Sequence, residues 1–252
     1  MNVCLLGREK IHSGTLLLVN EKHPLIGGDA RGLAPVDESC PDIFMKRDAV
    51  NVLRLILEKI SAGGRIVPVS GWRSAKEQRD IFDKSLRENG GEFTRKFVAL
   101  PNCSEHQTGL AIDLALDALD IDFICPEFPY DGICKEFRET APDYGYIERY
   151  PAGKEKITGI AHEPWHFRYV GFPHSAIITK NGLALEEYIE FIKAYGEENR
   201  LVFESKGNPP IEIFYAPAAF DKTRISMPKN GIYQISGNNT DGFIVTVWRK
   251  GQ

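Results

Sequence analysis

Pro164, within the pentapeptide His162–His166 (H-E-P-W-H), restricts the fold of this chain more than any other residue. The pattern H-E-x-x-H is typical of helical metalloproteases, whose two histidines lie one helical turn apart. A proline, however, disfavours the α conformation of the residue before it, which here is Glu163. In the following residues, 165–170, aromatic side chains alternate with His, Arg and Val, as expected for a strand. We therefore expect a strand here, and not a helix that carries both histidines.

The stretch Ser104–Asp113 (S-E-H-Q-T-G-L-A-I-D) carries a histidine and a carboxylate seven residues apart. Residues 108–116 favour a strand, because large apolar residues alternate with small or polar ones. The two sets are Leu110, Ile112, Leu114 and Ala111, Asp113, Ala115. On a straight strand an odd offset would place His106 and Asp113 on opposite faces. We expect a turn or bulge at Thr108-Gly109 to bring the two side chains together.

These two stretches contain a candidate metal site formed by His106, Asp113 and His166. Two imidazoles and one carboxylate leave zinc a fourth position for water, which suits a catalytic site better than a structural one. Glu163, three residues before His166, would then be the catalytic base. The alternative interpretation is that the histidines are unrelated and the carboxylate is solvated.

The other histidines and the cysteines have simpler interpretations. Cys103 lies three residues before His106 and is an alternative ligand or nucleophile, although nitrogen and oxygen ligands already suffice nearby. The five cysteines are odd in number, irregularly spaced and without a C-x-x-C pair, which is typical of reduced structural thiols. The remaining histidines are interpreted as flanking residues: His12, His23, His162 and His174.

Arg73 lies between a predicted strand and a predicted helix. Residues 65–70 favour the strand, and Ser74-Ala75-Lys76-Glu77 fits a capping box at the start of the helix. Rigid elements on both sides would hold a catalytic cation in place. A surface arginine in a loop fits the same spacing, so the pattern leaves both interpretations open.

The remaining pattern predicts an α+β fold, with a central antiparallel sheet and flanking helices around the metal site. Helices are expected at 48–62 with Asp48 as N-cap, around 132–140, and from Leu185 onward; 117–160 is otherwise a long irregular connection that shapes access to the site. Leu16–Val19 is expected to add an edge strand. Strands at 211–215, 232–235 and 243–248, with turns at Asn230-Gly231 and Asp241-Gly242, predict a small C-terminal β appendage. We expect a catalytic domain at 1–199, with its motifs in 70–170, and the appendage at 200–252.

The charge and hydropathy of the chain exclude some classes of function. A net charge of −4 lacks the basic excess that nucleic-acid binders normally show, so no nucleic-acid partner is expected. The only apolar run near the N-terminus, Leu16–Val19, is too short for a signal peptide or a membrane span. We expect a cytoplasmic protein without a membrane anchor.

Three motifs resemble those of one enzyme family. S-E-H-Q-T-G-L-A-I-D and E-P-W-H-F-R-Y-V-G closely resemble motifs of the zinc D,D-peptidases of the VanX, VanY and VanXY group, and S-G-W-R-S-x-x-x-Q resembles their arginine motif. The resemblance covers roughly residues 50–195, with the motifs in the family's order. The chain looks most like the VanXY enzymes, which are cytoplasmic and have both D,D-dipeptidase and D,D-carboxypeptidase activity. Its extra C-terminal segment is similar to that of the VanXYG type.

The resemblance implies a role for each matching residue. His106, Asp113 and His166 would hold Zn²⁺, Glu163 would be the base and Arg73 would stabilise the oxyanion. Two further matching residues would help to hold the substrate: Gln78 and Ser104. The implied substrates are D-Ala-D-Ala and peptidoglycan-precursor pentapeptides, as in vancomycin resistance. Two alternatives remain: a related zinc peptidase of other specificity, such as an L,D-carboxypeptidase or an endolysin, and a zinc-bearing binding module without catalysis.

Overall fold

The computed structural model describes residues 2–27, 30–204, 209–228 and 231–249. By its internal contacts the chain forms two compact units, which are described separately below. The larger unit is Val19–Ala184, and the smaller one combines Met1–Leu18 with Leu185–Gln252. The domain boundary expected after residue 199 stays a prediction, because a compact unit need not fold independently.

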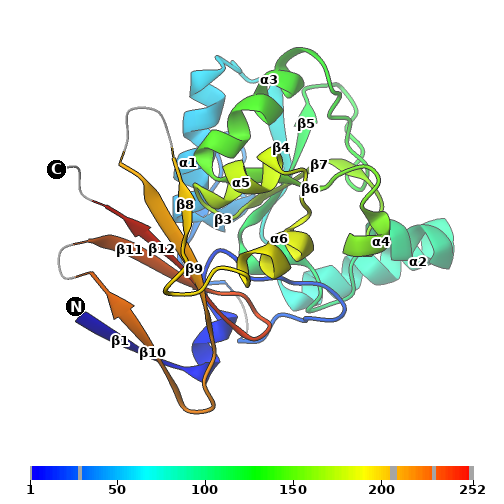
Figure 1. Ribbon diagram of the computed structural model, residues 1–252. Helices are drawn as coiled ribbons and strands as arrows, with labels where there is room; N and C mark the ends of the chain where they lie inside the picture. Colours follow the sequence, from blue (N-terminus) through cyan, green and yellow to red (C-terminus); the bar gives the residue numbers. More distant parts are fainter. Residues whose placement is uncertain (1, 28–29, 205–208, 229–230, 250–252) are drawn as a thin grey trace. The chain divides into compact units, whose positions relative to one another are not determined.

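The larger unit is built on a four-stranded sheet in the order β4-β5-β7-β6, and every neighbouring pair is antiparallel (Figure 1). A separate two-stranded sheet joins β2 and β3. The strands are β2 (Leu33–Pro35), β3 (Phe44–Lys46), β4 (Ile66–Ser70), β5 (Ala111–Leu116), β6 (Tyr146–Tyr150) and β7 (Glu163–Tyr169). The strand predicted from Pro164 and the following alternation is therefore confirmed as β7.

Helices of the larger unit surround this sheet. They are α1 (Arg47–Lys59), α2 (Ala75–Phe97), α3 (Gly132–Thr140), α4 (Glu155–Thr158) and α5 (His174–Lys180), with the 3₁₀ turns η2 (Glu105–Thr108) and η3 (Ala141–Tyr144). Leu53 of α1 and Phe137 of α3 are fully buried in one core with Ile112 and Phe167 of the sheet. Because side chains alternate along a strand, the opposite face of β5 and β7 is left for polar residues.

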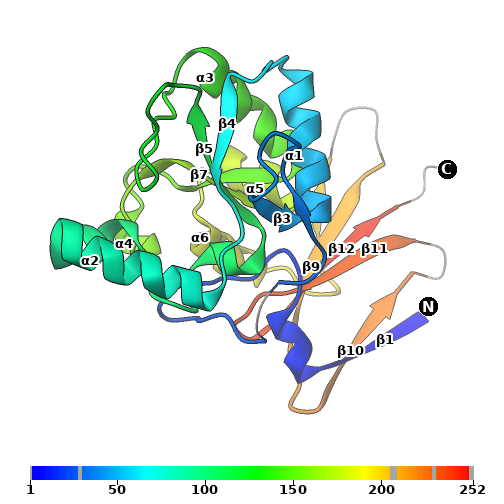
Figure 2. The same ribbon diagram turned by 180° about the vertical axis from the view of Figure 1, so that it is seen from behind.

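Helices α2 and α4 lie next to each other in both views (Figures 1 and 2). Just after α4, Ala161 donates its backbone N–H to the carbonyl of Lys96, near the end of α2, at 3.0 Å. Helix α2 is interrupted at Gly90, which has φ 78° and ψ 167° and produces a kink. The C-terminal turns of α2 thus run beside α4.

The starts of two helices test the capping predictions. The capping box at α2 is confirmed: Ser74 Oγ accepts from the backbone N–H of Glu77, whose carboxylate accepts from the N–H of Ser74. The N-cap predicted for the helix at 48–62 is wrong, because α1 already begins at Arg47 and its N-cap is Lys46. Asp48 lies within the first turn instead, where the positive end of the helix dipole stabilises a carboxylate.

The smaller unit consists mainly of strands. A two-stranded sheet pairs β1 with β10, and a four-stranded sheet has the order β11-β12-β9-β8. Its elements are β1 (Asn2–Gly7), η1 (Arg8–His12), α6 (Leu185–Ile192), β8 (Leu201–Phe203), β9 (Ile211–Pro217), β10 (Lys222–Met227), β11 (Ile232–Gly237) and β12 (Gly242–Trp248). The predicted helix from Leu185 and the three predicted C-terminal strands are confirmed. The turn expected at Asn230-Gly231 falls partly outside the described residues.

The N-terminal strand was predicted at the wrong place. Leu16–Val19 is buried but forms no strand, whereas Asn2–Gly7 pairs along its whole length with β10. Leu18 is held in the smaller unit by irregular bonds, with its N–H donated to the carbonyl of Asn238 at 3.1 Å. A short apolar run therefore signalled burial here, and not an extended ladder.

In the described ranges, none of the helices has both the length and the apolar content that crossing a bilayer requires.

Candidate functional site

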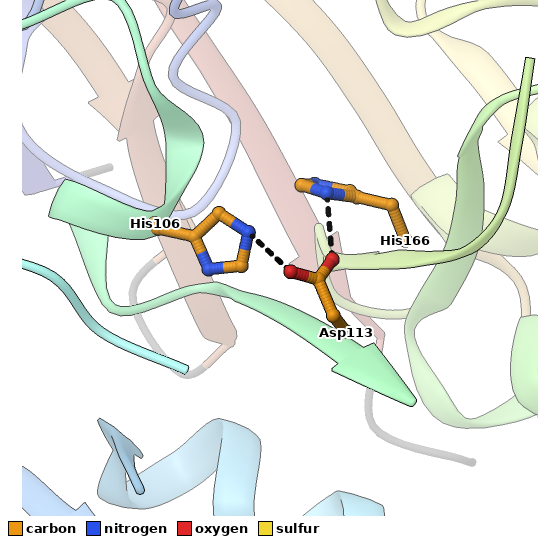
Figure 3. A group of neighbouring side chains, drawn as sticks. All are labelled: His106, Asp113 and His166. Carbon is orange, nitrogen blue, oxygen red and sulfur yellow. Dashed lines mark ion pairs between the residues drawn. The ribbon is translucent and has the colours of Figure 1, made fainter. Parts of the chain in front are cut away.

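Asp113 and His166 form a directly opposed pair on the neighbouring strands β5 and β7. Opposed residues of an antiparallel pair project from the same face of a sheet. Asp113 Oδ1 lies 3.0 Å from His166 Nδ1, and both side chains are buried (Figure 3). Sheet register alone thus joins two of the three predicted ligands, although 53 positions separate them in the chain.

His106 reaches the same point from the turn that precedes β5 (Figure 3). Residues 105–108 form the 3₁₀ turn η2, so the strand expected at 108–116 begins only at Ala111. Gly109 ends the turn in the left-handed region, with φ 70° and ψ 16°. The Nε2 atom of His106 comes within 3.1 Å of Asp113 Oδ2. The predicted turn at Thr108-Gly109 is confirmed, and it compensates for the odd offset between His106 and Asp113.

Gly109→Ala is expected to destabilise the protein by about 1–3 kcal/mol, because alanine is strained at positive φ. A Cβ at this position would also lie 2.9 Å from Leu33 Cδ2. Thermal unfolding should show a Tm lower by about 3–10 °C. Gly182→Ala is the matched control: its φ is +60°, but a Cβ there meets nothing within 4 Å. Equal losses in the two variants would show that the close approach at Gly109 is unimportant.

Glu163 lies at the first position of β7 and lines the same pocket as His166. Three residues apart, the two side chains would leave a regular strand on opposite faces. The register between β6 and β7 shifts between Glu148 and Tyr150, and Tyr150 is the partner of Glu163. This irregularity accompanies an approach of 3.5 Å between Glu163 Oε2 and His166 Nδ1. A second interruption of regular geometry thus brings another predicted residue to the site.

Burial and neighbouring charges set the protonation of these groups. Burial raises the pKa of Glu163 to about 8, since it disfavours the charged carboxylate. Burial lowers the pKa of His106 to about 4, and the positive charge of Arg73 acts in the same direction. For His166 burial is outweighed by contacts with Asp113 and Glu105, which raise its pKa to about 9. The two histidines therefore differ, with His106 kept neutral.

The donor atoms of the three residues fit a metal ion. His106, Asp113 and His166 each offer a buried ligand atom, and these atoms lie within 4.8 Å of one another. His106 donates from Nδ1 to the carbonyl of Gly71 at 2.6 Å, which leaves the Nε2 lone pair directed at the site. Within the described residues, neither His106 Nε2 nor Asp113 Oδ1 has a hydrogen-bond partner of acceptable geometry. A cation would satisfy both atoms.

Arg73, the predicted catalytic cation, is placed beside Asp113 by the segment between β4 and α2. Its Nη2 lies 3.5 Å from Asp113 Oδ2, and its side chain is largely buried. Gln78 and Ser104 are also buried and line the same pocket. Gln78 donates to the carbonyl of Ala99 at 2.8 Å, while its own carbonyl oxygen has no partner among the described residues.

Three buried residues that the sequence analysis did not select form an ion cluster next to His166. Glu105 binds Arg149 and Arg168, each at 2.8 Å, and all three side chains are fully buried. Its other oxygen, Oε2, lies 3.8 Å from Nε2 of His166. Burial alone would raise the pKa of Glu105, but the two arginines hold it well below its usual value. The signal was present in part, since Glu105 adjoins His106 and Arg168 shares the strand face of His166.

The alternative ligands lie elsewhere. His162 Nε2 is 2.7 Å from the hydroxyl of Tyr130, which also donates to Glu148 at 2.5 Å. His174 is buried in α5, and Cys103 is a free thiol that lines a different cavity. Over the parts of the chain that are described, the metal-binding group contains His106, Asp113 and His166, and no cysteine.

Comparisons with known proteins agree with this site. Residues 43–172 match the family VanY, D-alanyl-D-alanine carboxypeptidase. The bifunctional D-Ala-D-Ala dipeptidase and carboxypeptidase VanXYC of Enterococcus gallinarum is 42% identical over 182 residues, which are 71% of this chain and 95% of that protein. The vancomycin-resistance D,D-dipeptidase VanXYg, solved with a D-Ala-D-Ala phosphinate analogue, is 62% identical with a TM-score of 0.98, covering 98% of this chain and 99% of that one.

A more distant structure shows the same fold with a metal. The vancomycin-resistance D,D-pentapeptidase VanY of a VanB-type cassette, solved with Zn(II), is 28% identical. The similarity covers 69% of this chain and 98% of that one, with a TM-score of 0.57. The match of residues 43–172 includes every side chain of the candidate site described above. The chain therefore belongs to the VanY family of D-alanyl-D-alanine carboxypeptidases.

Proposed function

We propose that this chain hydrolyses free D-Ala-D-Ala and removes the C-terminal D-Ala from peptidoglycan-precursor pentapeptides, as in vancomycin resistance. The observation that carries the proposal is the buried group His106, Asp113 and His166, with Glu163 at 3.5 Å from His166. Support comes from the identity of 62% to the D,D-dipeptidase VanXYg and of 42% to VanXYC, which is both a D-Ala-D-Ala dipeptidase and a carboxypeptidase. The proposal includes a cytoplasmic location, because the enzyme would encounter free D-Ala-D-Ala in the cytoplasm.

The resident cofactor in this proposal is zinc. Two imidazole nitrogens and one carboxylate oxygen match the donors of a catalytic zinc site with an open position. Zinc held by His106, Asp113 and His166 would lower the pKa of a bound water and polarise the substrate carbonyl. Glu105 would keep the ring of His166 oriented from the opposite side, at 3.8 Å from its Nε2.

Glu163 acts as the general base and then as the general acid. It takes a proton from the attacking water, whose oxygen forms a bond to the carbonyl carbon of the terminal amide. When the carbon–nitrogen bond breaks, Glu163 returns this proton to the leaving amine of D-Ala. Its raised pKa favours the second step, because a buried carboxyl group that can hold a proton near neutral pH is a competent acid.

Arg73 is the group in position to stabilise negative charge on the carbonyl oxygen. It is charged, largely buried, and fixed between β4 and α2 beside Asp113. Preorganised donors of this kind contribute most in sites that exclude water. Gln78 and Ser104 line the pocket and would bind polar groups of the substrate.

The test is release of D-alanine from free D-Ala-D-Ala and from a pentapeptide that ends in D-Ala-D-Ala. We expect release from both, and its loss in the presence of a zinc chelator. A tetrapeptide ending in L-Lys-D-Ala is the specificity control. Cleavage of the tetrapeptide alone would replace the proposal by an L,D-carboxypeptidase. Bound zinc without hydrolysis of any of the three peptides would indicate a binding module.

A further inference from the structure

A second cavity adjoins the candidate active site in the larger unit. It encloses about 140 Å³ between the C-terminal turns of α2, helix α4 and residues 20–22. Four residues line both this cavity and the active-site pocket: Val98, Ala99, Tyr150 and Ile160. The two cavities therefore adjoin at these four residues, and the second cavity is the neighbouring space for a molecule that extends past Tyr150 and Ile160.

Basic side chains predominate around this cavity. Lys22, Arg95 and Lys156 belong to its lining, and Glu21 is the one acidic residue there. The three basic residues are exposed and form no ion pair with any residue that the structure describes. The chain as a whole has a net charge of −4, so this local excess of positive charge runs against its average. Such a surface attracts anionic groups.

The thiol of Cys103, which also belongs to the lining, does not cancel this charge. Cys103 is partly buried, and burial together with the negative charge of Glu21 raises the pKa of its thiol. The thiol therefore stays neutral near pH 7. Ile157 is an exposed apolar residue of the same lining and offers a surface for the carbon chain of a ligand.

The chemistry of a carboxypeptidase fixes which part of a substrate can extend beyond the site. The substrate ends at the residue that is released, so it continues only in the direction of its N-terminus. Free D-Ala-D-Ala has nothing upstream of the scissile residues, whereas a precursor peptide has several residues there. An upstream acidic side chain would meet the positive charges of the second cavity.

From this geometry we propose that the second cavity is a subsite for the carboxylate-bearing upstream part of longer D,D-peptides. Arg95 and Lys156, from α2 and α4, supply the positive charge, and Lys22 adds to it from the N-terminal segment. The inference deepens the proposed function and rests on it. It assigns the recognition of the longer substrate to residues that the free dipeptide does not reach.

Two N-acetylated pentapeptides test the subsite. Both end in D-Ala-D-Ala, and they differ only in whether the second residue carries a free carboxylate or the corresponding carboxamide. Their dissociation constants are measured on the Glu163→Gln variant, so that binding is read without turnover. At low salt the acidic peptide is expected to bind about fivefold more tightly, as weak ion pairs at exposed sites allow, and the preference should fall as salt is added.

The deciding variant is Arg95→Ala/Lys156→Ala, introduced into the same background. It should lose the preference for the acidic peptide while binding of the neutral peptide stays the same. Lys84→Ala/Arg87→Ala is the matched control, because it removes two exposed positive charges from α2 that do not line the cavity. An equal preference before and after the Arg95/Lys156 change would overturn the subsite, and so would the absence of any preference in the parent protein.

Turnover measurements on the same variants with Glu163 restored distinguish a failure of this inference from a failure of the proposed function. The kcat/KM for free D-Ala-D-Ala should be unchanged in the Arg95/Lys156 variant, and that for the acidic pentapeptide should fall about fivefold. If the parent protein released no D-alanine at all, the proposed function would fail. The binding comparison would still decide whether the cavity recognises the carboxylate.

Discussion

Glu163→Gln is expected to lower kcat for D-Ala-D-Ala by about 10²- to 10⁴-fold, the usual contribution of a general acid–base group. Glutamine has nearly the same shape as glutamate but cannot accept a proton from water or return it to the leaving amine. The side chain lies 3.5 Å from His166 Nδ1, outside the group of candidate ligands. Zinc content, measured by atomic spectroscopy, should therefore stay that of the parent protein.

The protonation of Glu163 gives this prediction a second readout. Burial raises its pKa to about 8, the negative charge of Asp113 adds to this effect, and the positive charges of His166 and Arg73 oppose it. A metal cation at the site would oppose this rise and bring the pKa of Glu163 back toward the range in which the carboxylate can act as a base. The basic form is lost as pH falls, so kcat of the parent enzyme should decline on the acidic side. The residual activity of Glu163→Gln should not show this decline of kcat at low pH.

Glu155→Gln is the control for the loss of a carboxylate. Glu155 is exposed on α4, and its substitution should leave turnover unchanged. Near-normal turnover of Glu163→Gln would remove Glu163 from the mechanism. Loss of zinc in that variant would instead assign it to the metal site.

His106→Ala is expected to weaken zinc binding by more than about a hundredfold, since even residues behind the ligands typically contribute 10- to 100-fold. The variant removes a nitrogen that is buried, without a hydrogen-bond partner in the described part of the chain, and 3.1 Å from Asp113 Oδ2. The purified variant should contain almost no zinc, and hydrolysis of D-Ala-D-Ala should disappear with the metal.

His162→Ala is the matched control for this experiment. His162 belongs to the literal H-E-x-x-H pattern, but its Nε2 contacts the hydroxyl of Tyr130 at 2.7 Å. Its variant should keep zinc at the parent level. Retention of zinc by His106→Ala together with its loss from His162→Ala would reverse the assignment and favour the helical protease pattern that Pro164 argues against.

The sequence was sufficient to predict the local parts of the site. The rule that proline disfavours helix at the preceding residue identified the strand that carries His166, and the alternation in 108–116 identified the face of Asp113. The odd offset between His106 and Asp113 required an irregularity, and Gly109 was the residue able to provide it. These inferences succeeded because each depends on the backbone preference of a few neighbouring residues.

The parts that failed depend on contacts between distant segments. The buried ion cluster of Glu105, Arg149 and Arg168 joins a 3₁₀ turn to two strands, and nothing in its spacing pairs one acid with two bases. The expectation that 117–160 is irregular apart from one helix was wrong, because Tyr146–Tyr150 forms strand β6, and the shift of register between β6 and β7 was hidden with it. The pairing of β1 with β10 links residues more than 200 positions apart, so no local pattern could reveal it.

That last pairing has a consequence for the order in which the protein is made. A ribosome delivers the first residues of the chain long before Lys222–Met227, which are the partner of Asn2–Gly7. Domains generally fold as their residues emerge, so Val19–Ala184 can become compact while β1 still lacks its partner strand. Until Lys222–Met227 leave the ribosome, that strand presents unpaired backbone groups and the exposed side chains of Val3 and Leu5. A truncation that removes Lys222–Met227 would make this temporary state a permanent one.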